Sequence, residues 1–564
     1  MKRISILLAL SLLVVISTAC KSEQTRQEKV SVIINKIDSP FFIATITPQN
    51  IIDKSGATDG VLPFTYETLV GFFMLEEETG IDNNTQVQLI AGKGSGIGVP
   101  NMYAIFKVND PVKFDEMIEK ELNATIKEKD GFKTIAKKKD NYVMVWNGEF
   151  AIAANVPINL ASLFGGGDET GKSINRCIKL LSDSDDDEVN QGYVDFMNKE
   201  DDIAAYFDSE GLIGFLAGMD MIEKEEIKNM KEEYGGNTME SYLNFENGSV
   251  KWEHKIFLSD ILTEKYNFIN EKGINNKMFE YGNSTEPMLK YSLNINPQLT
   301  ADFMKIQMKE NDYEKFEEEL KSKGYAVKDL VNTFTGEVLF MLDGFTFKTE
   351  MIDYGYGEPF EMTSSEPVMG VVMGVKDKSI FSNLPEEILV TENGIMSFED
   401  GFYGVVVSDY LFASNDSAWV NKVIDGQTTK LKDEEGTLTK QPYGFYASFG
   451  NPNHAEMFKK EFPMAEILEN VWGYANLSEA EINIVLKDKS QNSLRVITKY
   501  ISDFIADEEM DANQDIKNML DQEALESIED GMETIEEGIN EVEEALEDVD
   551  IEGAVNDILK EVSK

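Results

Sequence analysis

Eight residues match the loop that holds phosphate groups in many nucleotide-binding proteins. The stretch from Gly166 to Ser173, GGDETGKS, fits the pattern G-x-x-x-x-G-K-[ST] at every fixed position. Such a loop presents backbone N–H groups to phosphate at the start of a helix, directly after a buried strand. Here the clear strand, Phe150 to Asn155, ends about ten residues early, and Asp168 and Glu169 would repel phosphate. A similar strand from Tyr410 to Asn415 is followed by a helix and a glycine turn. We therefore interpret GGDETGKS as a turn that ends a helix, and expect no nucleotide binding.

An acidic run offers a second kind of chemistry. Asp183, Asp185 and Asp187 alternate in the run that ends at Glu188, and carboxylate oxygens are ligands that calcium prefers. The run lacks the glycine and the glutamate of an EF-hand loop at the sixth and twelfth positions. These observations favour a solvated acidic linker over a calcium site, and the sequence leaves calcium binding open.

Other catalytic groups are sparse. The only histidines, His254 and His454, lie in unrelated settings, a strand edge and a loop, which predicts neither a histidine-ligated metal site nor a catalytic dyad. Cys177 lies in a helix-like apolar pattern that is typical of a buried, inert thiol. The 103 acidic residues supply many carboxylates, and no pair of the glycosidase type stands out among them. We expect no catalytic residue, no metal and no cofactor.

Aromatic residues give little support to carbohydrate capture. The four tryptophans all fall in predicted strands or helices, so we expect them in the core. They are Trp146, Trp252, Trp419 and Trp472.

The N-terminus is predicted to direct the chain to the bacterial cell envelope. A basic start precedes an apolar run from Ile4 to Ile16, and small residues lead to Cys20. This pattern is typical of a secretory signal peptide, and its end resembles the lipobox of bacterial lipoproteins, in which the cysteine is acylated. We expect residues 1–19 to be removed, Cys20 to carry a lipid, and residues 20–30 to form a polar tether. The alternative is ordinary secretion with cleavage near Ala19.

Charge limits the class of partner. Lysine and arginine number 52 against 103 acids, which gives a formal net charge of -51. Nucleic acid is excluded as a partner because its binding rests on cationic neutralisation of phosphate. An anionic lipid surface would repel the body of the protein, so the lipid on Cys20 must hold it at the membrane. No later segment offers the roughly 20 apolar residues that a transmembrane helix needs.

Several stretches of the chain occur twice, in the same order. Phe41–Asn50 is similar to Leu289–Leu299, and each is an alternating strand that enters a helix through Pro-Gln. Tyr103–Phe114 is similar to Met369–Phe381, where a strand leads to an Asp before a helix. These matches predict two related halves. Two shorter pairs follow in the same order, namely Phe150–Asn155 with Tyr410–Asn415 and Tyr242–Phe245 with Tyr474–Leu477.

The order of the elements predicts an α+β fold. Strand runs such as Thr125–Lys137 and Asn141–Trp146 follow one another without a crossover helix, which favours antiparallel sheets. Helices such as Lys113–Glu121 and Tyr313–Lys323 interleave with the strands. Val338–Gly344 is typical of a strand that ends in a hairpin turn. We expect each half to be a mostly antiparallel sheet with helices on one face.

The C-terminus is predicted to be an acidic amphipathic helix. Apolar residues step by three and four along it, and the flanking positions are almost all Glu or Asp. A symmetric dimer would bring glutamate against glutamate, so we expect the helix to dock onto the protein's own body or onto a basic partner. The apolar positions are Leu525, Ile528, Met532, Ile535, Ile539, Val542, Leu546 and Val549.

Together these features resemble a family of uncharacterised Bacteroidota-type lipoproteins known only by a domain of unknown function. The resemblance rests on the lipobox at Cys20, the strand that enters a helix through Pro-Gln, the Asp-capped helix after an alternating strand, and the phrase KEDDIAAYFD at Lys199–Asp208. It covers most of the chain from Ser31 to about Tyr500 and implies an envelope lipoprotein of mixed α/β build. It brings no catalytic residues.

The sequence therefore favours a non-enzymatic, lipid-anchored protein of the outer membrane that binds or scaffolds another envelope or extracellular component. The alternative is a hydrolase of the cell envelope that depends on nucleotide or on carboxylates. The expected organisation is a signal peptide (1–19), a polar tether (20–30), a first half (31–270), a second half (286–500) and an acidic helical tail (507–564).

Overall fold

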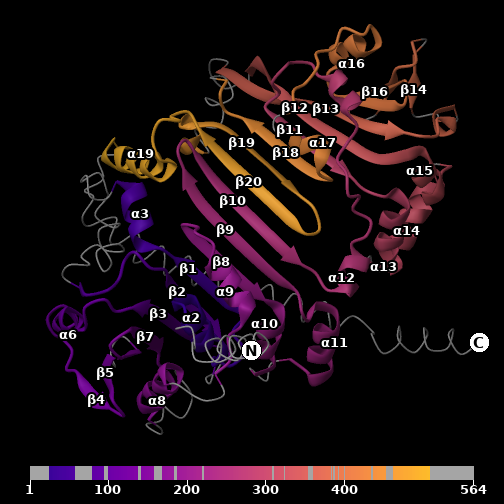
Figure 1. Ribbon diagram of the computed structural model, residues 1–564. Coiled ribbons are helices and arrows are strands. Elements are labelled where there is room, and N and C mark those ends of the chain that lie inside the picture. The colour runs from indigo at the N-terminus through magenta and orange to yellow at the C-terminus, as the bar shows by residue number, and fades with distance from the viewer. Residues whose placement is uncertain are drawn as a thin grey trace, which may run out of the picture.

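The structure is a computed structural model in which helices and one large antiparallel sheet combine, so the α+β class is confirmed (Figure 1). The signal peptide, Cys20 and the acidic tail lie outside the described residues. The structure describes residues 24–56, 79–94, 99–137, 141–157, 168–182, 187–218, 222–307, 310–322, 324–352, 360–382, 384, 388–391, 393–398, 401–433, 436–451 and 462–507.

The described strands pair into one sheet, and every pairing is antiparallel. In chain order they are β1 (Phe42–Ile46), β2 (Val87–Gly92), β3 (Asn101–Lys107), β4 (Lys127–Lys129), β5 (Phe132–Lys137), β6 (Tyr142–Trp146), β7 (Phe150–Asn155), β8 (Ile203–Asp208), β9 (Thr238–Glu246), β10 (Ser249–Phe257), β11 (Leu289–Asn294), β12 (Phe334–Ile352), β13 (Phe360–Val375), β14 (Leu389–Val390), β15 (Met396–Ser397), β16 (Tyr403–Val407), β17 (Tyr410–Ser414), β18 (Tyr443–Ser448), β19 (Leu468–Ala475) and β20 (Glu479–Leu486).

The helices lie around this sheet. They are α2 (Arg26–Asn35), α3 (Pro48–Ser55), α6 (Pro111–Lys120), α8 (Glu169–Leu181), α9 (Gln191–Met197), α10 (Ser209–Gly218), α11 (Lys224–Tyr234), α12 (Asp260–Lys265), α13 (Pro297–Gln307), α14 (Glu310–Ser322), α15 (Val327–Thr333), α16 (Ser417–Ile424), α17 (Thr437–Lys440) and α19 (Ser493–Asp507), with the short 3-10 helices η2 (Asn276–Tyr281), η3 (Ser379–Ser382) and η5 (Pro463–Glu466).

The strand order runs outward from the pairing of β10 with β20 at the centre of the sheet. On one side β9, β8, β1, β2, β3, β7, β6, β5 and β4 follow in turn, and on the other side β19, β18, β11, β12, β13, β17, β16, β15 and β14. β1 leads into α3 through Pro48, and β11, at the corresponding place, leads into α13 through Pro297.

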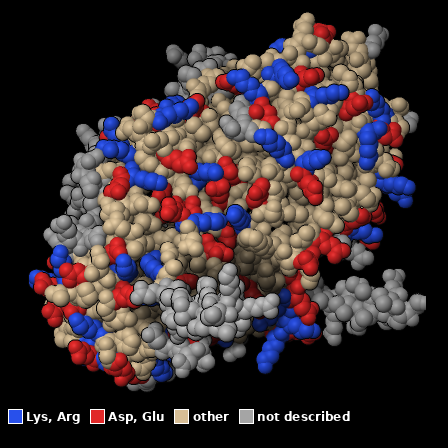
Figure 2. All heavy atoms as spheres, viewed as in Figure 1, with Lys and Arg blue, Asp and Glu red and all other residues tan. Residues whose placement is uncertain are grey.

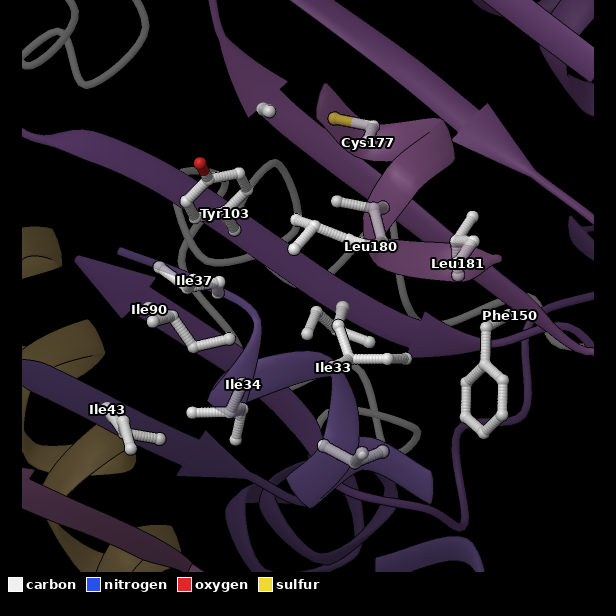
Figure 3. Packing of buried hydrophobic residues seen from close by; sticks show 14 of the residues in the cluster. Ile33, Ile34, Ile37, Ile43, Ile90, Tyr103, Phe150, Cys177, Leu180 and Leu181 are labelled. Atoms are coloured by element: carbon white, nitrogen blue, oxygen red, sulfur yellow. The ribbon is translucent and has the colours of Figure 1, made fainter. Parts of the chain in front are cut away.

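Helices α2, α8 and α9 cover one side of the sheet near its N-terminal end. Ile34 of α2 and Cys177 of α8 pack with Ile43 of β1 and Tyr103 of β3 in one buried cluster, which Figure 3 shows at close range. The apolar residues of β1 and β3 alternate with residues on the opposite side, as strand geometry requires. Thr25 caps α2 and its hydroxyl accepts the Glu28 N–H at 3.2 Å. Because α2 begins at Arg26, it starts inside the predicted 20–30 tether.

A second cluster covers the same side of the sheet beyond β11. Trp419 of α16 is fully buried, its indole N–H donates to the carbonyl of Tyr281 at 2.9 Å, and its ring packs against Phe412 with centroids 5.3 Å apart. A side chain at Gly370 would meet the Trp419 ring at 2.5 Å, so only glycine fits beneath it. Residues 276–281, in the interval left between the two predicted halves, form η2 and belong to this cluster.

The opposite side of the sheet is covered at its far N-terminal end. There Phe114 of α6 packs edge-to-face on Trp146, with centroids 5.5 Å apart, together with Phe106 and Ala151. Because these strand residues alternate with those of the first cluster, α6 lies across the sheet from α8. The prediction of helices on one face is therefore wrong for α6. Its start was predictable, since Asp110 caps it and Pro111 occupies the first turn.

Two other predictions differ from the structure. β12 does not turn after Asp343 but continues to Ile352, with an irregularity in its pairing between Leu342 and Gly344. A bulge of this kind lets a strand pass a glycine without ending. Residues 127–137 form two strands that a turn at Asp130 and Gly131 joins, instead of one run.

Candidate functional site

The phosphate-like loop begins a helix, so its interpretation as a helix-ending turn is wrong. Asp168 is the N-cap of α8, and Gly171, Lys172 and Ser173 lie in the first turns. α8 packs on β6 and β7 as α16 packs on β16 and β17. Asp416 is likewise the N-cap of α16. The sequence comparison failed because α16 follows its strand directly, whereas residues 156–168 separate β7 from α8.

The helix start is nevertheless closed to phosphate by its own side chains. The Asp168 carboxylate accepts the Gly171 N–H at 2.9 Å, which is one of the amides that a phosphate would need. Lys172 Nζ pairs with Glu169 at 2.7 Å. Ser173 is buried, and its hydroxyl accepts a hydrogen bond from Arg176 at 3.1 Å. An incoming phosphate would have to displace a carboxylate beside a second one, so the loop is a capped helix N-terminus.

The acidic run that was weighed as a calcium site is only partly described. Residues 183–186 lie outside the described residues. Asp187 forms an ion pair with Lys36 at 2.8 Å, and the same lysine donates to the carbonyl of Ser182 at 2.7 Å. Among the residues that the structure describes, no three acidic, histidine or cysteine side chains gather in a way that would hold a metal ion.

The remaining candidates from the sequence are the two cysteines and the two histidines. Cys177 is buried, and burial raises the pKa of its thiol to about 12, as expected for an inert cysteine. His254 lies on β10 beside Trp252, and burial lowers the pKa of its imidazole. His454 and Cys20 lie outside the described residues. No helix in the described part of the chain combines the length and apolar content that crossing a membrane requires.

Where β10 meets β20, two glutamates lie directly opposite each other. Glu253 pairs in register with Glu481, and the next residues outward in the same row are Tyr242 and Tyr474. Opposed residues of an antiparallel pair have Cβ atoms about 4.5–5.5 Å apart, which is the order of separation between the carboxylates of retaining glycosidases. The sequence could not single out this pair, because its members are about 230 residues apart and only strand pairing brings them together.

A single lysine bridges this pair. Lys251 Nζ lies 3.2 Å from Glu253 and 3.7 Å from Glu481. Burial lowers the pKa of Lys251, but its hydrogen bond to Glu253 and the charge of Glu481 outweigh that effect and place the pKa above its ordinary value. The Tyr474 hydroxyl also donates to Glu481 at 3.2 Å. Both carboxylates are thus engaged in one ion-pair and hydrogen-bond network with Lys251 and Tyr474, whereas glycoside hydrolysis needs a pair that is free to act on substrate.

The central strands have opposite chemistry on their two sides. The side that carries Glu253 also carries Lys251, Lys255 and Glu240, and we call it the charged side. Lysine, arginine and acidic residues interleave over the middle of the face seen in Figure 2. Lys199 Nζ lies 3.4 Å from the centre of the Tyr242 ring on this side.

The side that carries Trp252 is apolar, and we call it the apolar side. From β1 through β12 the paired residues that face this way include no lysine, arginine, aspartate or glutamate. Its centre is partly exposed: Trp252 is 42% exposed, and Met239 and Tyr291 are exposed as well. Its members on the central strands are Met239, Ser241, Leu243 and Phe245 of β9, Val250, Trp252, His254 and Ile256 of β10, Ala480, Ile482 and Ile484 of β20, Val471, Gly473 and Ala475 of β19, Tyr443, Phe445 and Ala447 of β18, and Leu289, Tyr291 and Leu293 of β11.

The tryptophans divide between core and surface. Trp146 and Trp419 are buried, which confirms the prediction for these two. Trp252 is exposed, so the prediction is wrong there, and Trp472 is half-buried. The Trp252 N–H donates to the Ser241 hydroxyl at 2.7 Å, which holds the ring on the apolar side. Strand alternation places Trp252 on one side of β10, but only the tertiary structure shows that its ring is exposed there.

Comparison with known proteins adds no assignment. No protein-family model matches the chain, and no curated protein matches it. Two crystal forms of the protein TP0453, forms I and III, are similar over 43% of this chain and over 87% and 88% of theirs, with 9% and 10% identity and a TM-score of 0.23 for both. A TM-score this low carries no argument about fold or function.

Proposed function

We propose that the protein is a non-enzymatic, lipid-anchored component of the bacterial cell envelope, held in the outer membrane through Cys20, that binds another envelope component. The contact is made by the apolar side of the central strands, and this side is the single observation that carries the proposal. Soluble proteins rarely leave large contiguous apolar surfaces uncovered, and such surfaces mark binding sites. In a chain with a net charge of -51, a side without charged residues over so many strands is a specific feature.

Photo-crosslinking in intact cells tests this contact. A benzophenone amino acid replaces Trp252 in one variant and Lys255 in a matched control, which lies on the same strand with its side chain on the charged side. Irradiation should join the protein to a membrane lipid or an envelope protein from position 252 but not from position 255. Equal adducts from both positions, or none from 252, would refute the contact. A self-adduct between two copies would assign the apolar side to a dimer instead.

The lipid anchor is tested separately. Metabolic labelling with an alkyne fatty acid should mark the wild-type chain, and Cys20→Ser should lose both the label and the membrane fraction. A Cys20→Ser chain that stays in the membrane fraction would remove the anchor from the proposal. Protease treatment of intact cells then distinguishes surface display from a periplasmic location, because only a displayed body is cut before lysis.

We further infer that residues 31–270 and 286–500 are two related halves of one duplicated unit. The strand order on either side of the β10–β20 pair supports this relation, and so do the corresponding Asp168 and Asp416 caps. The acidic tail from residue 507 is proposed to dock on the protein's own body or on a basic partner.

The alternative function, hydrolysis that depends on carboxylates, would use Glu253 and Glu481. The ion pairs of Lys251 with both glutamates argue against it. Glu481→Gln removes one carboxylate, and a glycosidase assay on cell-wall polysaccharide should find no activity in either the wild-type protein or the variant. Activity that the variant loses would favour the alternative.

A further inference from the structure

A cavity of about 260 Å³ lies where α13, α14 and α15 pack over one end of β12 and β13. Ala301 and Met304 of α13, Phe316 of α14 and Leu330 of α15 form one wall, and Val338 and Met373 of the strands form the other. The cavity therefore lies between a group of three helices and the sheet. Figure 1 shows these helices together beside the long β12–β13 pair.

The cavity borders the apolar side of the sheet. Val338 lies opposite Leu293 in the pairing of β11 with β12, and Leu293 belongs to the apolar side. Met373 lies opposite Val338 in the pairing of β12 with β13. The strand wall of the cavity is thus a continuation of the same apolar surface under the three helices.

The polar side chains of the lining are engaged elsewhere. The lining includes only three of them, Thr300, Tyr313 and Glu337. Thr300 donates its hydroxyl to the carbonyl of Asn296 at 2.8 Å. The Tyr313 hydroxyl hydrogen-bonds Glu317. The Glu337 carboxylate accepts the N–H of Asn275 at 2.8 Å and the hydroxyl of Thr335 at 3.1 Å. A ligand that requires hydrogen bonds would find its needs unmet here.

These limits exclude a peptide as the occupant. An extended segment brings an N–H and a C=O for each residue, and each would be buried without a partner. A helix satisfies its own backbone, but its diameter of about 10–12 Å is far greater than that of a hydrocarbon chain. Hydrocarbon has neither restriction, because it is narrow and needs no polar partner.

We propose that this cavity holds one fatty acyl chain. If a methylene takes roughly the 30 Å³ that a water molecule occupies in the liquid, the cavity accepts on the order of nine methylenes. The remainder of the chain and any polar head then lie along the apolar side, outside the helices. The inference rests on the proposed function, because it names hydrocarbon as the part of the envelope component that enters the protein.

Binding of cis-parinaric acid, a fluorescent fatty acid, to the full-length protein tests the proposal. The wild-type protein should bind the probe saturably at one site, and palmitate should displace it. Ala301→Phe places a ring in the cavity and should weaken binding by roughly tenfold or more. Lys305→Phe adds the same ring to the exposed face of the same helix and should leave binding unchanged. Equal affinity of Ala301→Phe and the wild-type protein would overturn the proposal.

A second variant covers the case in which Ala301→Phe does not fold. Met304→Ala removes lining volume and enlarges the cavity. Displacement by saturated fatty acids of increasing length should shift toward longer chains in this variant relative to the wild-type protein. An unchanged length preference in folded Met304→Ala would count against the cavity as the acyl site.

Two further measurements identify the source of the acyl chain and distinguish the acyl site from the proposed contact on the apolar side. Displacement by palmitate alone indicates free fatty acid, whereas displacement by palmitoyl lysophospholipid as well indicates membrane lipid. Either result supports an acyl site. Crosslinks from position 252 should persist in Ala301→Phe, since that position lies on a central strand away from the three helices. Loss of probe binding in Ala301→Phe with retained crosslinks supports the cavity, whereas retained probe binding in this variant refutes the cavity alone. Absence of crosslinks from position 252 in the otherwise wild-type protein refutes the apolar-side contact alone.

Discussion

Trp419 on helix α16 and Trp252 on strand β10 lie against the same sheet, and their surroundings differ completely. Trp419 is fully buried beneath Gly370, with its N–H bonded to a backbone carbonyl. Trp252 has 42% of its surface exposed and is held by one hydroxyl and the neighbouring His254 ring. One indole fills a core and the other is presented to solvent. The difference shows that the ends of the sheet are built for stability, whereas its centre keeps an apolar surface available.

The largest expected effect comes from the covered end. Trp419→Ala removes a fully buried indole and leaves a cavity beside Phe412, so the free energy of unfolding should fall by about 3–5 kcal/mol. Denaturant unfolding followed by circular dichroism measures this loss. A decrease below about 1 kcal/mol would show that the second cluster does not depend on this residue.

Alkaline pH should also destabilise the covered ends. Burial raises the pKa of Tyr103 and of Tyr281 from the ordinary value of 10.0 to about 12. In the unfolded chain both groups ionise near 10. Above that pH the unfolded state binds fewer protons than the folded state, so stability is complete below pH 10 and is lost as pH rises through about 12. Phenolate absorbance should rise together with unfolding, and ionisation of these tyrosines near pH 10 in a folded chain would contradict the expectation.

An intermediate effect is expected at the border between covered and open strands. Asp202 is almost fully buried, pairs with Lys54 at 2.7 Å and accepts the Phe245 N–H at 2.7 Å. Asp202→Ala leaves that N–H without its acceptor and should lower the free energy of unfolding by about 1–3 kcal/mol, as measured by thermal or denaturant unfolding. Asp195→Ala, on the exposed face of α9, is the matched control and should change little. Equal effects of the two substitutions would show that the buried Asp202 contributes no more to stability than an exposed aspartate does.

A smaller effect on stability is expected from the open centre. Trp252→Ala should lower the free energy of unfolding by less than about 1 kcal/mol, since the ring is only partly buried. The same variant should lose much of its binding to the envelope component, measured by co-purification with the partner that crosslinking identifies. A loss of stability as large as that of Trp419→Ala would erase the contrast between the two tryptophans.

The smallest effect is expected at Lys172. Its ammonium group is exposed and pairs with Glu169 within one helical turn, an arrangement that contributes little. Lys172→Ala should leave stability within about 0.5 kcal/mol of the wild type. Calorimetric titration with ATP should show no binding to either protein. Saturable ATP binding that this substitution abolishes would show that the capped helix start opens to phosphate.

Local patterns predicted most of the elements, because their causes are local. Asp110 and Pro111 mark the start of α6, and alternation marks β7 with the bounds that the structure has and β6 to within one residue. The prediction for the loop at Gly171 was wrong. The comparison with the segment after β17 could not decide between a helix end and a helix start, because residues 156–168 have no counterpart there. Asp343 misled for a related reason, since an aspartate before glycine favours a turn locally while the pairing with β13 carries β12 onward.

The candidate sites were beyond the reach of the sequence for a physical reason. Strand pairing brings Glu253 opposite Glu481. The exposure of Trp252 depends on which segments pack against its side of the sheet. A side chain's position on a strand is set by alternation, but its exposure is set by distant segments. Of the three helices that line the cavity, α13 and α14 were predicted at least in part and α15 was not, and the cavity itself exists only in their packing.

The pairing of β10 with β20 imposes an order on folding. β10 is complete at Phe257, and its partner begins at Glu479, so roughly 220 residues must be delivered before this ladder can close. Until then β10 is an unpaired edge with an apolar side, the kind of edge along which strands of other chains aggregate. A chain that crosses a membrane from its N-terminus would carry this exposed edge throughout the transfer. Pairing of the last strands thus closes the exposed edge of the newly made protein. A chain that stops before Glu479 should aggregate with other copies along β10 while its N-terminal strands remain paired.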